Sequence, residues 1–161
     1  MIAHTPATSI PAHALVHAHL STLLTALWFE IDHGDGSGAS GFFTGDAELT
    51  FSRRTFRGTD EIDGVYRARA ARGPRVSRHL MSNLHVQRHE PDLVEAVSAL
   101  VLYAHDGKAP IPTTTPVLVA DVFDHFVRVS EPDGQTRWLI TSRRIENCFL
   151  MPGDVLAVPT E

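Results

Sequence analysis

The sequence predicts an α+β domain in which helices pack on one face of a curved antiparallel sheet. In the first half of the chain, apolar residues recur at intervals of three and four, which places them on one face of a helix. After Gly73-Pro74 the interval changes to two, and four long runs rich in Val, Leu, Phe and Thr follow, as in β-strands. At 161 residues and 17.7 kDa the chain can bury one good core. We therefore expect one domain over residues 12–150, with tails at residues 1–11 and 151–161.

The first half of the chain is predicted to hold two helices and one strand. The first helix runs from Ala12 to Asp32 and is stopped by the glycine-rich segment 34–38. A strand is expected over residues 47–53, where apolar and polar residues alternate. The second helix is expected to follow Thr59, which can cap it, and its first turn is acidic, as the positive end of the helix dipole favours.

The second half of the chain is predicted to form four long strands. Short turn signals at Pro91-Asp92 and Asp133-Gly134 separate successive runs, so two of the connections should be antiparallel hairpins. Residues 106–115 are expected to form a longer loop. The four strands are expected at residues 76–87, 93–105, 116–130 and 135–147.

Composition and charge exclude several classes of function. The net charge of −5 makes nucleic acid an improbable partner, and the single cysteine, Cys148, excludes an intramolecular disulfide and a thiolate metal cluster. Neither a secretory signal nor a run of eighteen apolar residues is found, so we expect a cytoplasmic protein that does not span a membrane. His13 and His17 lie one helical turn apart and could share a metal, but no motif supplies a third ligand, so no metal site is expected.

The candidates for catalytic residues are polar residues within otherwise apolar strands. A carboxylate among apolar neighbours has its pKa raised or finds a donor, and both outcomes suit a general acid or base. In the third predicted strand one face carries Asp121 and His125; the other carries Leu118, Ala120, Val122, Asp124 and Phe126, and either face could be internal. In an earlier strand His79, Met81 and Asn83 share a face, although a core histidine with satisfied hydrogen bonds is the alternative for His79.

Four segments resemble the SnoaL-like branch of the nuclear transport factor 2 superfamily, which includes ketosteroid isomerase, scytalone dehydratase and the polyketide cyclases. They are Phe29-Glu30-Ile31-Asp32, residues 42–49, Gly58-Thr59-Asp60-Glu61-Ile62 and Arg78-His79-Leu80-Met81-Ser82-Asn83. The resemblance covers roughly residues 12–147. It implies a cone-shaped α+β barrel, in which a strongly bent, mainly antiparallel sheet wraps around the helices and encloses a deep apolar pocket.

The resemblance also implies roles for individual residues. Asp124-His125-Phe126 resembles the strand in which ketosteroid isomerase keeps its protonated aspartic acid, which favours the face that carries Asp124. His79 resembles a pocket histidine of scytalone dehydratase. The base of ketosteroid isomerase falls on Phe51, and the helix aspartate of the dehydratase falls near Phe29, with Asp32 close by. Steroid isomerisation by that mechanism is therefore not expected.

The function expected from these residues is that of a cofactor-independent lyase or isomerase on a small cyclic or polyketide-like compound. Proton abstraction next to a carbonyl would be followed by reprotonation or loss of water, which requires neither a metal nor an organic cofactor. Asp124 and His79 are the expected acid/base pair. The expected substrate-binding residues are Asn83, Asp32, Tyr66, Met81, Val122 and Phe126.

Two other functions share this expected fold. The protein could bind a small hydrophobic or cyclic ligand without catalysis. It could also resemble the structural β subunits of ring-hydroxylating dioxygenases, which have a similar Arg-His-x-x-x-Asn run. A bent sheet covered by helices on one side leaves its other face free, so a homodimer is expected as well.

Overall fold

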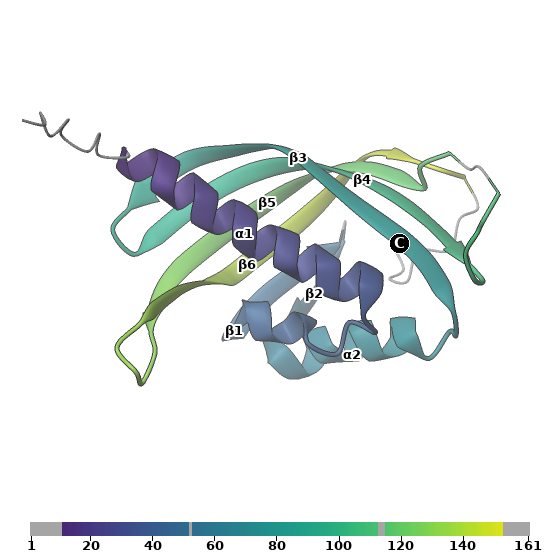
Figure 1. Ribbon diagram of the computed structural model, residues 1–161, viewed down its shortest axis with the longest axis horizontal. Coiled ribbons are helices and arrows are strands. Elements are labelled where there is room, and N and C mark those ends of the chain that lie inside the picture. The colour runs from purple at the N-terminus through teal and green to yellow at the C-terminus, as the bar shows by residue number, and fades with distance from the viewer. Residues whose placement is uncertain (1–10, 52, 113–114, 153–161) are drawn as a thin grey trace, which may run out of the picture.

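The described residues form two α-helices, one 3-10 turn and a single six-stranded sheet (Figure 1). The computed structural model describes residues 11–51, 53–112 and 115–152, so the predicted tails lie almost entirely outside it. In chain order the elements are α1 (Ala12–His33), η1 (Ala39–Phe42), β1 (Phe43–Phe51), β2 (Arg54–Arg57), α2 (Gly58–Ala70), β3 (Arg75–Glu90), β4 (Leu93–Asp106), β5 (Leu118–Ser130) and β6 (Thr136–Leu150).

The strands are ordered β2-β1-β6-β5-β4-β3 in a mixed sheet. The predicted hairpins are confirmed, because β3 pairs antiparallel with β4 and β5 pairs antiparallel with β6. The sequence did not predict the parallel pairing of β1 with β6, in which Leu49 lies opposite Arg143. The α+β class is confirmed. The bent sheet is open, with β2 and β3 as its edges among the described strands (Figure 1).

Two boundaries differ from the sequence prediction in the region of β1, β2 and α2. The predicted strand at residues 47–53 begins earlier, at Phe43, and the short strand β2 follows it and pairs back on it. Helix α2 begins at Gly58, so Thr59 is not its cap. Instead, the carboxylate of Glu61 accepts a hydrogen bond from the backbone N–H of Arg57 (2.8 Å), which satisfies a donor at the start of the helix.

Both helices pack against the sheet and bury its core (Figure 1). Helix α1 lies across β3, and α2 packs on β1. By length and composition alone α1 could cross a membrane, but core helices of soluble proteins share these properties. Its buried side chains lie in the protein core and are Val16, Leu20, Leu24, Leu27, Trp28 and Ile31.

A β-bulge in β6 changes which side chains face the core. His125 of β5 pairs with Ser142, but the next residue of β5 pairs with Ile140, so Thr141 is an extra residue in β6. Trp138 and Ile140 are buried before the bulge, and Arg143 and Ile145 are buried after it. The inserted residue therefore brings an arginine to the buried face.

A second bulge has the opposite effect in β3. The register shifts between Ser82 and His85, and Asn83 lies within the shift with a positive φ of 53°. Ser77 and His79 face α1 before the bulge, whereas Val86 packs against the core after it. Asn83 itself is exposed.

Candidate functional site

A cavity of about 90 Å³ lies between the helices and the sheet, large enough for several water molecules. Its walls come from both helices and from strands β1, β3, β4, β5 and β6, and most of them are apolar. The polar groups that line it are Tyr66, Arg69, Arg75, Ser77, His79, Arg143 and Asn147.

His79 and Asp32 form a hydrogen-bonded pair at the wall of this pocket. Asp32 lies in the last turn of α1, and one of its oxygens, Oδ1, is 2.7 Å from Nδ1 of His79. The other oxygen accepts the backbone N–H of His79 (2.7 Å), and the hydroxyl of Ser77 donates to Oδ1 (2.7 Å). The carboxylate thus joins the end of the helix to the middle of β3 and fixes the imidazole ring.

Burial and hydrogen bonding set the protonation of this pair. Burial lowers the pKa of His79, and the neighbouring Asp32 carboxylate opposes this only in part. Burial would raise the pKa of Asp32, but the hydrogen bonds and charge of His79, with the Ser77 hydroxyl, outweigh it and hold the pKa below its ordinary value. A neutral ring that donates from Nδ1 to an ionised Asp32 leaves Nε2 as a proton acceptor.

Trp28 links this pair to a second buried pair. Its ring is stacked on His79, with centroids 4.4 Å apart and planes within 8°. The guanidinium carbon of Arg143 lies 4.9 Å from the centre of the same ring. Arg143 in turn donates from Nε and Nη2 to the two oxygens of Asp124, over 2.7 and 2.9 Å.

The Arg143–Asp124 pair is almost completely inaccessible, with side-chain exposures of 1% and 2%. Arg143 lines the pocket, and its Nη1 is buried without a hydrogen-bond partner among the described residues. An unpartnered donor of this kind costs free energy unless a ligand or water accepts from it. Arg143 therefore keeps one charged donor, buried beside the pocket, that the described residues leave unsatisfied.

Tyr66 of α2 supplies another polar group to the lining. Burial raises its pKa to about 12, although the charges of Arg143 and Arg69 act in the opposite direction. The phenol is therefore protonated at neutral pH and can donate a hydrogen bond to a ligand oxygen.

The structure brings part of the sequence-predicted site together. His79 and Tyr66 line the pocket, and Asp32 holds His79 in place. Asp124 lies on the buried face of β5, where it is paired with Arg143 and is not among the described residues that line the pocket.

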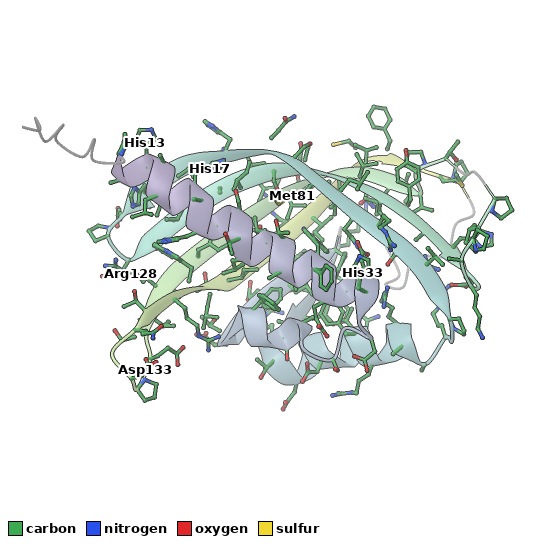
Figure 2. All side chains as sticks on the ribbon, in the orientation of Figure 1. His13, His17, His33, Met81, Arg128 and Asp133 are labelled. Atoms are coloured by element: carbon green, nitrogen blue, oxygen red, sulfur yellow. The ribbon has the colours of Figure 1, made fainter. Side chains whose placement is uncertain are left out.

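The other predicted binding residues are placed differently. Asn83 is exposed on the bulge of β3, and Met81 is half-buried at the edge of the core beside α1 (Figure 2). Val122 and Phe126 are buried in the core on β5, and neither is among the described residues that line the pocket.

The sequence did not identify Arg143, Arg69, Ser77 or Trp28 as site residues. The signal for Ser77 was present, because it alternates with His79 on β3, and Trp28 lies on the buried face of α1. The sequence did not indicate Arg143 because the alternation of buried and exposed residues along β6 is interrupted by the bulge at Thr141.

Another group of histidines lies away from this pocket. His13 and His17 are at one end of α1, opposite the end that carries His33 (Figure 2), and they share a shallow hollow with His85 and His89 of β3. Within residues 11–51, 53–112 and 115–152, no three His, Cys, Asp or Glu side chains are placed to hold a metal ion.

Comparison with known families gives one clear match. The family described as SnoaL-like domain matches residues 13–144. No curated protein matches the chain significantly.

Solved structures with the same fold come from several bacteria. A putative scytalone dehydratase from Novosphingobium aromaticivorans is 16% identical with a TM-score of 0.73, covering 89% of this chain and 91% of that one. ActVI-ORFA from Streptomyces coelicolor is 18% identical with a TM-score of 0.66, covering 86% and 99%. A Catenulispora acidiphila protein in complex with S-DNPA is 22% identical with a TM-score of 0.68, covering 83% and 94%. At these identities the similarity shows a common fold.

Proposed function

The chain belongs to the SnoaL-like domain family, and we propose that it is a cofactor-independent lyase or isomerase acting on a small cyclic or polyketide-like compound. The observation that carries this proposal is the imidazole of His79, held by Asp32 at the wall of a mostly apolar pocket. Two of the similar structures, a putative dehydratase and a protein bound to S-DNPA, are consistent with small-molecule chemistry in this fold.

His79 acts as the general base in this proposal. Its Nε2 takes a proton from a carbon next to the carbonyl group of the substrate. The C–H electron pair forms a C=C bond to the carbonyl carbon, and the C=O π pair moves to the oxygen to give an enolate. The enolate then collapses in one of two ways. The proton returns to a different carbon, which is isomerisation, or a β-hydroxyl group leaves with a proton as water, which is dehydration.

Two hydrogen-bonded groups support the base. Asp32 keeps the Nδ1–H tautomer and stabilises the imidazolium that forms when Nε2 is protonated. The protonated phenol of Tyr66 can donate to the developing enolate oxygen.

Asp124 receives a different role from the one that its sequence context suggested. Both oxygens of its carboxylate accept hydrogen bonds from Arg143, so a proton on Asp124 would break a buried ion pair. We assign Asp124 to positioning Arg143, and the acid/base work to His79 alone. Substrate contacts by Asn83, Met81, Val122 and Phe126 stay predictions.

Exchange of carbon-bound protons with solvent tests the function without knowledge of the product. In D₂O, the protein should catalyse loss of the α-proton NMR signal of at least one member of a panel of cyclic ketones and hydroxyketones. Because burial lowers the pKa of His79, the rate should hold below pH 6.5 and fall only as acid protonates the ring. Heat-denatured protein is the control. Binding without exchange across the panel would contradict catalysis and favour a noncatalytic binding protein.

The predicted homodimer is a separate proposal. Large apolar side chains are exposed outside the pocket, among them Leu80 on β3 and Phe149 on β6, and contact with a second copy would cover such surface. Light scattering at micromolar concentration should give twice the monomer mass of 17.7 kDa. A mass of 17.7 kDa would refute this prediction. Cytoplasmic location likewise stays a prediction.

A further inference from the structure

The polar groups of the pocket are unusually one-sided in charge. Three arginines, Arg69, Arg75 and Arg143, line it, whereas no aspartate or glutamate is among its described lining residues. Arg75 is paired with Asp106 outside the pocket (2.5 Å). The wall therefore offers hydrogen-bond donors and positive charge to whatever occupies the cavity.

Two of these arginines retain unused binding capacity. Nη1 of Arg143 is buried and has no partner among the described residues, while its other two donor atoms are taken by Asp124. Arg69 has no ion pair within 4 Å to a described carboxylate: its Nη2 donates to the hydroxyl of Ser77 (2.9 Å), and the charge of Asp32 acts on it from farther away. The carboxylate of Asp32 accepts hydrogen bonds from the hydroxyl of Ser77 and from His79, and these occupy both of its oxygens.

We infer that the pocket is built for a ligand with a carboxylate group, which accepts a hydrogen bond from Nη1 of Arg143 and faces the charge of Arg69. This inference rests on the proposed function and names its substrate class: a small cyclic monocarboxylate. A carboxylate suits a guanidinium better than a neutral carbonyl because hydrogen bonds between two charged groups are shorter and stronger. The rest of the wall is mostly apolar, which suits the ring of such a compound.

The position of Arg143 connects this binding group to the base. Its guanidinium lies over the ring of Trp28, and the same ring is stacked on His79. A carboxylate held by Arg143 therefore lies near Trp28, the side chain that also packs on His79. This hydrogen bond orients the ring of the substrate so that one of its carbon-bound protons is presented to Nε2.

Pairs of ligands that differ only in charge test this inference. Benzoate and benzamide, cyclohexanecarboxylate and its amide, and 1-naphthoate and its amide have nearly the same shape, and their affinities can be measured by titration calorimetry up to 10 mM. The carboxylate should bind roughly 10- to 100-fold more tightly in at least one pair, the range expected for a hydrogen bond between charged groups. Equal or tighter binding of the amide in every pair, or no carboxylate binding, would overturn the inference.

A double variant tests whether Arg143 causes the preference for carboxylate ligands, because it removes the arginine without leaving the charge of Asp124 buried and unpaired. Arg143→Met combined with Asp124→Leu replaces the ion pair by apolar side chains, and it should reduce the preference for carboxylate to about threefold or less. The matched control is Arg128→Met, which removes an arginine from an ion pair with Asp92 at the far end of the sheet (Figure 2) and should leave the preference unchanged. An unchanged preference in the double variant would overturn the assignment to Arg143.

The two proposals fail in different ways. If neutral cyclic ketones exchange their protons and carboxylates do not bind, the proposed function stands and this inference is wrong. If carboxylates bind selectively and no ligand exchanges protons, the carboxylate site stands and the proposed function is wrong.

Discussion

Replacing His79 by asparagine is expected to slow proton exchange on the best ligand by roughly 100- to 10,000-fold, the usual contribution of a general base. The asparagine amide N–H can occupy the place of Nδ1 and keep the hydrogen bond to Asp32, so the fold should survive. The side chain has no nitrogen that accepts a proton at neutral pH. The rate is measured by NMR in D₂O, and folding is checked by a thermal melt of the same sample.

His85→Asn is the matched control for this variant. His85 lies on the same strand, beyond the bulge, and is exposed, so its replacement should leave the exchange rate unchanged. Equal rates for wild type and His79→Asn, with both folded, would exclude His79 as the base.

The second large effect concerns stability. Asp124→Asn should lower the free energy of unfolding by about 3 to 5 kcal/mol, because it leaves the buried guanidinium of Arg143 without its counter-charge. For a domain of this size the melting temperature should fall by roughly 6 to 20 °C. Thermal and urea denaturation measure the change.

Two comparisons separate this cause from a general effect of mutating β5. Asp121→Asn changes an exposed carboxylate on the same strand and should alter the free energy of unfolding by no more than about 0.5 kcal/mol. The double variant Asp124→Leu with Arg143→Met removes both charges and should recover most of the lost stability. A stable Asp124→Asn protein that no longer exchanges protons would instead support the acid/base role that the sequence suggested for Asp124.

Most of the fold could be predicted because regular periodicity marks its elements. The intervals of three and four along α1 and the alternation along β4 and β5 correspond directly to the buried side chains. The parallel pairing of β1 with β6 could not be predicted, because no local pattern records which distant strands meet. The short strand β2 was missed because four residues carry little periodic signal.

The candidate site was predicted only where alternation is unbroken. His79 lies before the bulge of β3, on a regular stretch, and it does line the pocket. Asn83 lies within that bulge and is turned out to solvent, and Arg143 follows the Thr141 bulge and is turned in. One inserted residue moves every later side chain of the strand to the opposite face of the sheet. The sequence pattern does not show where such an insertion lies.

The order of strands in the sheet has a consequence for how the protein acquires its ligand site during synthesis. Of the described strands, β6 is the last to leave the ribosome, yet it lies between β1 and β5, and it carries Arg143. An incomplete chain that ends before β6 has Trp28, Asp32 and His79 but lacks the cation that we infer to hold the ligand. A ligand that binds through Arg143 can therefore stabilise finished chains alone, and cannot assist the folding of nascent ones.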